Sequence, residues 1–417
     1  MTNGPPRVAG VGSAERPLFR SFFIGGFECS THVRRDGRRL DLIASTHHDV
    51  FVREDYERLA SVGILTARDG VRWHLVDRGD GRYDWSSVLP MLRAARETGV
   101  QVIWDLLHFG WPEDLGVYSP EFVRRFEAFA RAFGRLLADE TDGTPMVAPV
   151  NEISFLSFAG GEAGFFNPFS KGRGDDLKRQ LVRASIAGGA AVLAAAPGAR
   201  LIHTDPIINI IADPERPEER LEAELYRQSM FAAWEMIAGK REPELGGDPR
   251  LLDVVGVNYY VHNQWTLNGG LLVPSKPQHL PVRFMLREVA LRLKRPIFVA
   301  ETGIEDYARA AWLHYMASEC RAAESLGVPV EGLCIYPIVN HPGWEDDRHC
   351  LNGLWDYADA SGHRPIDPPF GEELARQQKL LADARAGVPL PREDFPESVF
   401  DRVAADLDAK TRQSRES

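Results

Sequence analysis

Two glutamates, each at the end of a short apolar run, are the residues of this chain best placed to do chemistry. Glu152 closes the run at 146–151, and Glu301 closes the run at 296–300. A short apolar run is typical of a buried strand, where a charge in the middle would carry a large desolvation cost. We therefore expect both acids at strand ends that open into a solvated cleft. Two carboxylates facing one another across a pocket are the minimum for glycoside hydrolysis, one as general acid and one as nucleophile or base.

The composition is that of an ordinary globular protein with an acidic balance. Of 417 residues, 44% are hydrophobic and 26% are charged, so the chain can bury a sizeable core. Its 49 Lys and Arg against 60 Asp and Glu give a net charge of −11, which repels polyanions. We therefore expect no nucleic-acid partner. The apolar stretch at 185–196 holds too few apolar residues to span a bilayer, so no membrane partner is expected either.

The cysteines and the amino terminus point to a reducing compartment. Four cysteines show no CxxC spacing and are too few for a disulfide scaffold. The first residues lack a basic segment followed by an apolar one. We therefore expect a cytoplasmic protein. The sequence leaves the oligomeric state open.

Apolar strand-like runs alternate with helical patterns along most of the chain, which favours a parallel sheet with helical crossovers. Eight strands each followed by a helix describe a closed (β/α)8 barrel. The predicted strands are 22–29, 64–73, 100–108, 145–152, 199–204, 252–260, 296–301 and 332–337. The predicted helices are 55–62, 85–98, 120–139, 177–196, 218–239, 284–293, 309–326 and 372–386.

The chain divides into one large domain with a segment at each end. Gly63, Gly99 and Gly327 follow predicted helices, where a left-handed cap is most easily adopted. No internal repeat or central linker interrupts this pattern, so a single TIM barrel is predicted. Its expected limits are 20–387, with a flexible amino-terminal segment at 1–19 and a polar carboxy-terminal tail at 388–417.

Six short motifs occur in order along the chain, most of them at the ends of predicted strands. They lie at 25–32, 67–73, 106–112, 149–152, 258–260 and 300–303. Each alone is a weak signal, but the series in this order is a strong one. In these motifs the chain resembles glycoside hydrolase family 1, the retaining β-glycosidases that place their two acids on barrel strands four and seven.

The resemblance implies a role for each residue of these motifs. Glu152 matches the acid/base of the family and must carry a proton, which an apolar setting or a neighbouring anion favours. Glu301 matches the nucleophile and must stay ionised, and Arg72 and Tyr260 stand at the positions that support it.

The remaining matches belong to the sugar-binding surface. Asn151 matches the residue that holds the sugar 2-hydroxyl, and His108 matches a ligand of another hydroxyl. Trp344 matches an aromatic platform, Asn258 opens the Asn-Tyr-Tyr triplet, and His32 stands where the family has glutamine. The implied partner is a small carbohydrate or glycoside, with no cofactor.

Several departures fall in the part of the site that identifies the sugar. Gly343 replaces an acid, Thr302 replaces an asparagine and Phe109 replaces a tryptophan. These changes leave the bond-breaking pair intact, so the resemblance does not specify a glucosidase. Nearby acids could replace the missing one: Glu28, Glu345, Asp346 and Asp347.

Structural roles are the alternative for the single residues. Arg72 could be an ion-pair partner within the barrel, His108 a core histidine and Trp344 a cap on the core. The cluster at 47–49 has the composition of a metal site, but its adjacent residues cannot easily converge on one ion, so we expect no metal.

The sequence thus predicts a retaining β-glycosidase that works by double displacement. A transglycosylase using the same covalent intermediate is one alternative. The other is a non-catalytic sugar-binding protein on a degenerate barrel. Loss of one of the two acids would indicate such a protein, and both acids are present.

Overall fold

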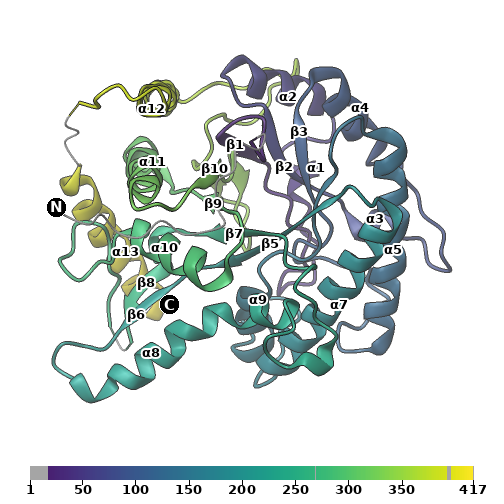
Figure 1. Cartoon of the computed structure of the whole chain (residues 1–417), viewed down its shortest axis with the longest axis horizontal. Coiled ribbons are helices and arrows are strands. Elements are labelled where there is room, and N and C mark those ends of the chain that lie inside the picture. The colour runs from purple at the N-terminus through teal and green to yellow at the C-terminus, as the bar shows by residue number, and fades with distance from the viewer. Residues whose placement is uncertain (1–16, 268, 392–395, 417) are drawn as a thin grey trace, which may run out of the picture.

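Eight parallel strands close into a barrel. The computed structural model describes residues 17–267, 269–391 and 396–416. Around the barrel the strands follow chain order, and the last one pairs with the first (Figure 1). The strands are β1 (Phe23–Gly26), β2 (Thr66–Gly70), β3 (Gln101–Asp105), β4 (Met146–Ala148), β5 (Arg200–Pro206), β7 (Val254–Asn258), β9 (Ile297–Thr302) and β10 (Val330–Ile335). Each lies within or across one predicted strand range, and the (β/α)8 fold class is confirmed.

Helices surround the barrel at the predicted places. They are α2 (Val52–Ser61), α4 (Leu89–Thr98), α5 (Pro120–Glu140), α7 (Gly174–Ala195), α8 (Arg220–Gln228), α9 (Ala232–Ile237), α10 (Val282–Leu293), α11 (Arg309–Ser325) and α12 (Pro368–Arg385). The helix predicted at 218–239 is broken into α8 and α9 by a 3-10 turn, and α8 projects away from the barrel in Figure 1. The glycines predicted to cap helices have left-handed backbones, with φ of 71° at Gly99.

The two longest helices show how local sequence determines this layer. Helix α5 begins where the Ser119 side chain accepts the backbone N–H of Phe122, and Pro120 follows at the first helical position. Its apolar stripe packs against α7, where Gly188 lies against the ring of Phe126. A β-carbon at Gly188 would lie 2.5 Å from that ring, so the close approach of the two helices requires glycine.

The barrel interior is filled by apolar side chains from the strands. Ile24, Ile103, Ile202, Val254 and Phe298 form one buried cluster, separate from the larger core between strands and helices. Because the interior is packed, a ligand can enter only at a mouth of the barrel. The carboxyl ends of the strands are the mouth at which such barrels carry their sites.

Short elements extend the chain beyond that mouth. The loops after β5 and β7 pair as a small parallel sheet of β6 (Asn209–Ile211) and β8 (Gln264–Thr266). The loop after β10 contains a small antiparallel pair, β11 (His341–Pro342) and β12 (His349–Cys350). After β4 the chain enters α6 (Ile153–Leu156) and a π-helical segment at Ser157–Glu162. These loops form the walls around the barrel mouth.

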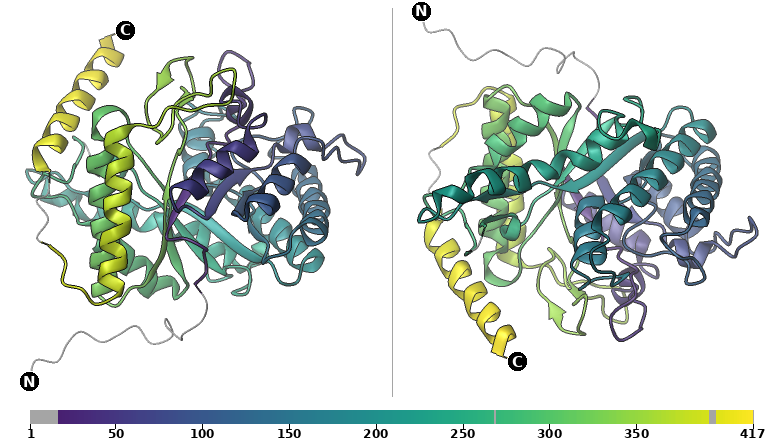
Figure 2. Two further views of the ribbon diagram at one scale, coloured as in Figure 1. Left: turned by 90° about the horizontal axis from the view of Figure 1, so that it is seen from above. Right: turned by 90° about the horizontal axis from the view of Figure 1, so that it is seen from below.

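The carboxy-terminal segment, expected as a polar tail, contains the helix α13 (Glu397–Glu416). Phe400 is fully buried there against the rings of Trp312 and Tyr315. The sequence signal was weak because the apolar residues of this helix are few. Figure 2 shows α13 beside the barrel. Residues 1–16, expected to be flexible, lie outside the described residues.

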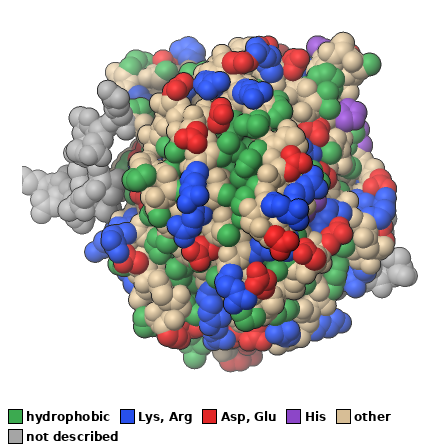
Figure 3. All heavy atoms as spheres, turned by 90° about the vertical axis from the view of Figure 1, so that its right-hand side faces the viewer, with side chains coloured by type: hydrophobic (Ala, Val, Ile, Leu, Met, Phe, Trp, Pro, Cys, Tyr) green, Lys and Arg blue, Asp and Glu red, His purple; other side chains and the backbone are tan. Residues whose placement is uncertain are grey.

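The surface carries mixed charge. On the face drawn in Figure 3, acidic and basic side chains are interspersed. Within the described ranges, no helix is both long enough and apolar enough to cross a membrane.

Candidate active site

The two glutamates lie at the carboxyl ends of the fourth and seventh barrel strands. Glu301 is the penultimate residue of β9. Glu152 follows β4 at the start of α6, and its φ of 47° is a left-handed value rare for a non-glycine residue. Its backbone N–H donates to the carbonyl oxygen of Thr204 at 3.0 Å, so strand β5 holds this unusual turn in place. Strained backbone of this kind clusters at functional sites.

Glu301 is surrounded by hydrogen-bond donors that stabilise its ionised form. Arg68 Nη1 donates to one carboxylate oxygen at 2.6 Å, and the Tyr260 hydroxyl donates to the other at 2.9 Å. Glu301 is buried, so this ion pair is shielded from water. Burial and the charge of Glu301 raise the pKa of Tyr260 well above its ordinary value, which keeps the phenol in its donating form.

Glu152 has the opposite surroundings. Its side chain is buried and accepts one hydrogen bond, from Asn258 Nδ2 to Oε1 at 2.9 Å. Burial raises the pKa of Glu152 well above its usual range, and the negative charge of Glu301 raises it further. A carboxylic acid that keeps its proton near neutral pH is the requirement for a general acid.

The arginine that contacts Glu301 is Arg68, whereas Arg72, which the resemblance placed there, lies elsewhere. Arg72 instead donates to Asp41 at 3.2 Å and to Asp49 at 3.0 Å. Strand β2 ends at Gly70, and the chain turns into the short helix α3 (Trp73–Val76), which carries Arg72 away from the barrel axis. Arg68 lies within the strand and is fully buried.

A chain of hydrogen bonds connects the strand ends around Arg68. Its guanidinium donates to both oxygens of Asp105 and, at 2.7 Å, to Asn151 Oδ1. The same amide oxygen accepts from the Thr204 hydroxyl at 2.8 Å. Side chains from β2, β3, β5 and β9 thus meet on one network, together with Asn151 from the end of β4.

His108 belongs to this network and is buried. Its Nδ1 lies 2.8 Å from Asp105 Oδ2, and its Nε2 lies 3.1 Å from Asn151 Nδ2. The carboxylate can only accept, so Nδ1 carries the proton and Nε2 accepts from the amide. Asn151 and His108, both predicted for sugar binding, therefore bond one another.

One group of residues has the composition of a metal site. Ligand atoms of Cys29, Asp105 and His108 lie within 4.8 Å of one another. However, Asp105 already forms an ion pair with Arg68 at 2.6 Å, and a cation would be repelled by that guanidinium. Burial and the charge of Asp105 raise the pKa of the Cys29 thiol, so it stays protonated. These three residues are therefore better explained as part of the hydrogen-bond network around Arg68 than as ligands of a metal ion.

His32 and Trp344 lie together in an aromatic cluster with Phe109, Phe155 and Phe166. The His32 ring centroid is 4.3 Å from that of Phe166 and 5.7 Å from that of Trp344. His32 is fully buried, and burial lowers its pKa to about 4, so it is neutral. Phe109, which stands where the resemblance implies a tryptophan, is fully buried within this cluster.

The candidate replacement acids lie in different places. Glu28 is buried and accepts from the Ser30 backbone N–H at 2.9 Å, with one oxygen 3.8 Å from His108 Nε2. Glu345 is half exposed and 3.7 Å from His32, while Asp347 pairs with Arg34 at 2.8 Å. Only Glu28 among these three is buried beside the network.

A buried acid that the sequence reasoning missed supports the turn of Glu152. Asp205, in β5, accepts from the backbone N–H of Ser154 at 2.9 Å and from its hydroxyl at 2.6 Å. These bonds hold the beginning of α6. Burial raises the pKa of Asp205 to about 7, and its charge contributes to the raised pKa of Glu152.

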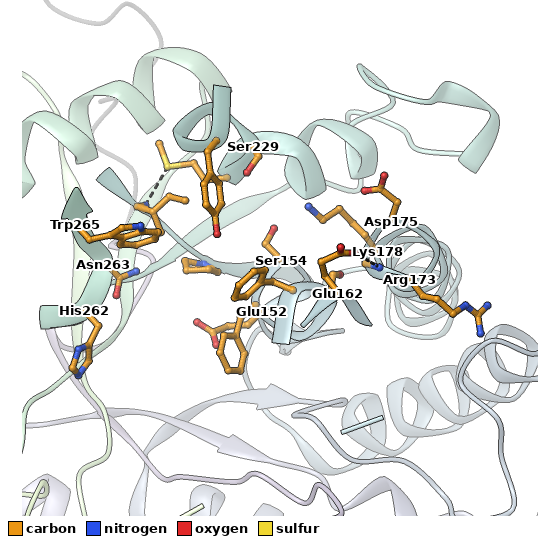
Figure 4. A pocket seen from close by; sticks show the side chains of 18 of the residues that line it. Glu152, Ser154, Glu162, Arg173, Asp175, Lys178, Ser229, His262, Asn263 and Trp265 are labelled. Carbon is orange, nitrogen blue, oxygen red and sulfur yellow. Dashed lines mark hydrogen bonds between the residues drawn. The ribbon is translucent and has the colours of Figure 1, made fainter. Parts of the chain in front are cut away.

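A cavity of about 1120 Å³ opens beside Glu152. Its walls combine charged and polar side chains with the aromatic residues Phe155, Phe158, Tyr226, Trp265 and Trp344. Figure 4 shows Glu152 and Ser154 between two sides of this space, with Trp265 and His262 on one side and Glu162 and Lys178 on the other. We call it the leaving-group cavity, because if Glu152 is the acid that the sequence predicts, a leaving group that accepts its proton would extend into this space.

Sequence reasoning also missed Arg68, Asp105 and Tyr336. The Tyr336 ring is parallel to that of His108, and the Arg68 guanidinium carbon lies 5.2 Å from its centroid. Arg68 carried a signal: a charged residue inside an apolar strand is expensive unless it is paired in the interior. Tyr336 ends the run of β10 at the same mouth as the two acids, which is the signal that could have found it.

No protein-family model matches this sequence, and no curated protein matches it. Solved structures do match. A family 1 β-glucosidase from Thermotoga maritima superposes with a TM-score of 0.70 at 14% identity, covering 88% of this chain and 99% of that chain. A β-glucosidase from the same organism, in complex with glucoimidazole, gives a TM-score of 0.72 at 14% identity with the same coverage.

A third similar structure is described as the AHE enzyme from Alicyclobacillus herbarius. It has a TM-score of 0.69 at 16% identity, covering 87% of this chain and all of that chain. At such identities the likeness concerns the fold. The chain therefore has the (β/α)8 fold of the family 1 β-glucosidases, a glycosidase fold, with a glutamate at the end of each of its fourth and seventh strands.

Proposed function

We propose that this protein is a retaining β-glycosidase in which Glu301 is the nucleophile and Glu152 is the acid/base. The observation that carries the proposal is the difference between the surroundings of the two carboxyl groups. Glu301 has Arg68 and Tyr260 to hold its charge, whereas Glu152 is buried with one amide donor and a raised pKa. Two carboxyl groups with such opposed environments identify an acid and a nucleophile.

In the first step, a Glu301 oxygen attacks the anomeric carbon of the sugar while Glu152 transfers its proton to the departing oxygen. The bond to the leaving group breaks with its electron pair on that oxygen, and a covalent glycosyl ester forms on Glu301. Loss of charge on Glu301 removes the main Coulombic reason for Glu152 to be protonated. The pKa of Glu152 therefore falls when it must next act as a base.

In the second step, Glu152 takes a proton from water, and the hydroxide formed attacks the anomeric carbon. The ester bond breaks, Glu301 regains its charge, and Glu152 regains its proton. Two inversions leave the configuration retained. The mechanism requires carboxyl groups about 5–5.5 Å apart, and a separation beyond about 6.5 Å in a crystal structure would contradict it.

The groups around Glu301 would bind the sugar. Asn151, His108, Asn258 and Tyr336 surround the mouth of the barrel, and Trp344 borders the leaving-group cavity. The similar structures support a carbohydrate ligand, since their descriptions name complexes with glucoimidazole, deoxynojirimycin and castanospermine. Because the positions of His32, Phe109 and Gly343 differ from those that the resemblance implies, the sugar has to be identified by assay.

The test is a panel of aryl β-glycosides, including glucoside, galactoside, fucoside, mannoside, xyloside and glucuronide. Wild type should turn over at least one, and Glu301→Gln should turn over none. Glu152→Ala should retain activity on substrates with good leaving groups and recover with azide, which needs no base. Full activity of both variants on the true substrate would refute the assignment of the pair.

Transglycosylation is the second candidate function. The leaving-group cavity supports it, because the cavity has room for an acceptor molecule. Its wall carries aromatic rings beside polar side chains, and such a wall can hold an acceptor other than water next to the same covalent intermediate. Product analysis with added alcohols and sugars separates the two reactions: a transglycosylase gives a new glycoside as the main product, and a hydrolase gives free sugar.

A further inference from the structure

A second cavity lies on the other side of Tyr260 and His262 from the leaving-group cavity. Its volume is about 540 Å³, and these two residues line both spaces. Pockets of about 300–1,000 Å³ are the usual size for small ligands. We call this space the side cavity. It is next to the catalytic centre without including either glutamate among its lining residues.

The side cavity is formed jointly by the barrel mouth and α13. Gly303 and Tyr336 at the ends of β9 and β10 line one side, and Val403 and Asp406 of α13 line the other. Several contacts hold helix α13 there, and two of them lie at this wall. Phe400 is buried against Trp312, and the Tyr307 hydroxyl donates to Asp406 Oδ2 at 2.8 Å. The helix that sequence reasoning missed thus becomes one wall of a pocket.

An unpaired acceptor belongs to the wall of this cavity. Asn352 is more than nine-tenths buried, and its Oδ1 has no hydrogen-bond partner among the described residues. The neighbouring histidine fixes the orientation of the amide. His341 Nδ1 lies 2.7 Å from the Pro342 carbonyl oxygen and must donate, so its Nε2 accepts from Asn352 Nδ2 at 3.0 Å. Oδ1 is therefore left without a donor, and because protein atoms cover it almost completely, a ligand hydroxyl reaches it only by displacing those atoms.

The charged groups of the wall also have acceptor capacity that their own hydrogen bonds do not use. The lining cation Arg348 is paired with Glu305 through two bonds of 2.6 Å and 2.9 Å. Asp406 accepts from Tyr307 through one oxygen and keeps further acceptor capacity, and the lining residue Asp306 is exposed. A ligand that satisfies this wall has to donate hydrogen bonds.

The rest of the wall is apolar or aromatic. Tyr260 and Tyr336 lie at the barrel side, and Ile304, Val403 and Leu407 complete the surface. A ligand with hydroxyl donors on its rim and a C–H face meets both demands, and pyranose rings have this character. Tyr260 also links the cavity to the chemistry, because its hydroxyl donates to Glu301.

We propose that the side cavity binds a saccharide unit through Asn352 and the inner face of α13. The choice of a sugar over another donor-rich ligand rests on the proposed function. The unit has two possible sources: the outer sugar of a substrate whose inner sugar is bonded to Glu301, or a free sugar that acts on the enzyme through Tyr260.

The binding test uses the full chain with Glu301→Gln, which holds ligands without turning them over. Glucose and cellobiose are titrated by calorimetry up to about 100 mM, within reach of weak affinities, and soaked into crystals. We expect saccharide density in the side cavity. Absence of density there and of binding overturns the proposal.

Two variants and a matched control assign the binding to this cavity. Ala409 lines the side cavity on α13 and is exposed, so Ala409→Trp should fill it without disturbing the core. Ala405 is exposed on the same helix but is not a lining residue, and Ala405→Trp is the control. We expect the first, and also Asn352→Leu, to weaken binding at least about tenfold. Equal binding by Ala409→Trp and Ala405→Trp would contradict the proposal.

Steady-state kinetics of the enzyme with Glu301 intact distinguish the two sources of the saccharide unit. If the outer sugar of the substrate occupies the cavity, Ala409→Trp raises KM for an aryl β-cellobioside and leaves that for an aryl β-glucoside unchanged. If a free sugar occupies it, added glucose changes kcat in wild type and has no such effect in Ala409→Trp. Failure of the proposed function would appear separately, as absence of turnover in wild type with saccharide binding intact in Glu301→Gln.

Discussion

Arg68 donates to Glu301 across the barrel mouth, with Nη1 2.6 Å from Oε1, although the two residues are 233 positions apart in the chain. The same guanidinium donates to Asp105 and Asn151, so one buried cation holds Glu301, the proposed nucleophile, together with its neighbours. This relationship makes Arg68 the residue on which the charge of Glu301 depends.

Replacing Arg68 with Met should reduce kcat/KM strongly and destabilise the protein. It leaves two buried carboxylates without their partner, and breaking a buried ion pair in this way destabilises by about 3–5 kcal/mol. Steady-state kinetics and urea unfolding measure the two effects. Arg72→Met is the matched control, because its partners Asp41 and Asp49 lie outside the site, and it should keep kcat/KM. An equal loss of activity in the two variants would argue against the role of Arg68.

Tyr260→Phe removes one hydrogen bond to Glu301 and little else. A hydrogen bond to a charged group is worth about 1.5–3 kcal/mol, so kcat/KM should fall by about 10- to 100-fold. The other phenol of the triplet provides the control. Tyr259 bonds Gln264 and His279 in the core, and Tyr259→Phe should affect stability more than kcat/KM. Unchanged kcat/KM in Tyr260→Phe would show that the phenol does not support the nucleophile.

Asp205→Asn should move the alkaline limb of the kcat/KM profile to lower pH. Glu152 must be protonated to act as an acid, and the charge of Asp205 is one cause of its raised pKa. Removing that charge lowers the pKa of Glu152, so the proton is lost at a lower pH. The difference should be largest above the Asp205 pKa of about 7, where wild type carries the charge.

The control for this prediction is Asp253, a partly exposed acid that directly precedes β7. Asp253→Asn breaks an ion pair with Arg200 at 2.6 Å, away from Ser154 and Glu152. Its pH profile should keep the wild-type alkaline limb. A limb that moves equally in both variants, or stays fixed in Asp205→Asn, would contradict the coupling.

Loss of the proton from His48 should make the protein less stable at alkaline pH. It lies 2.8 Å from both Asp55 and Asp69, and although burial opposes its charge, these carboxylates raise its pKa to about 9. A pKa raised on folding contributes stability that is complete below the unfolded value near 6.5 and is lost as pH rises through about 9. The contribution is on the order of 3 kcal/mol.

Urea unfolding at several pH values measures this dependence. Wild type should lose stability between about pH 6.5 and pH 9, and His48→Asn should be less stable at neutral pH and lack that slope. His363→Asn is a suitable control, because His363 is exposed. A wild-type slope retained in His48→Asn would assign the dependence to other groups.

The fold could be predicted because its signals are local. Each barrel strand is a short apolar run, and glycines such as Gly99 end the helices with the left-handed backbone that their position predicts. Helix α13 escaped prediction because its burial depends on the distant partners Trp312 and Tyr315, which no local pattern in 397–416 reveals.

The site was predictable only in part, for the same physical reason. Glu152 and Glu301 were found from the strand ends that they occupy. The choice between Arg68 and Arg72 depends on where β2 ends, and a boundary error of a few residues reverses it. Asp205 and Tyr336 act through neighbours that are brought together only by closure of the barrel.

The network around Arg68 would make the proposed catalysis depend on closure of the barrel. Its members come from β2, β3, β5 and β9 and from the end of β4, and each bond in it joins two strands or a strand and a loop. Separation of any two of these strands would break hydrogen bonds to the charged groups of the site. Activity is therefore a direct reporter of the closed barrel: it should disappear with the first strand pair that opens, before the outer helices unfold.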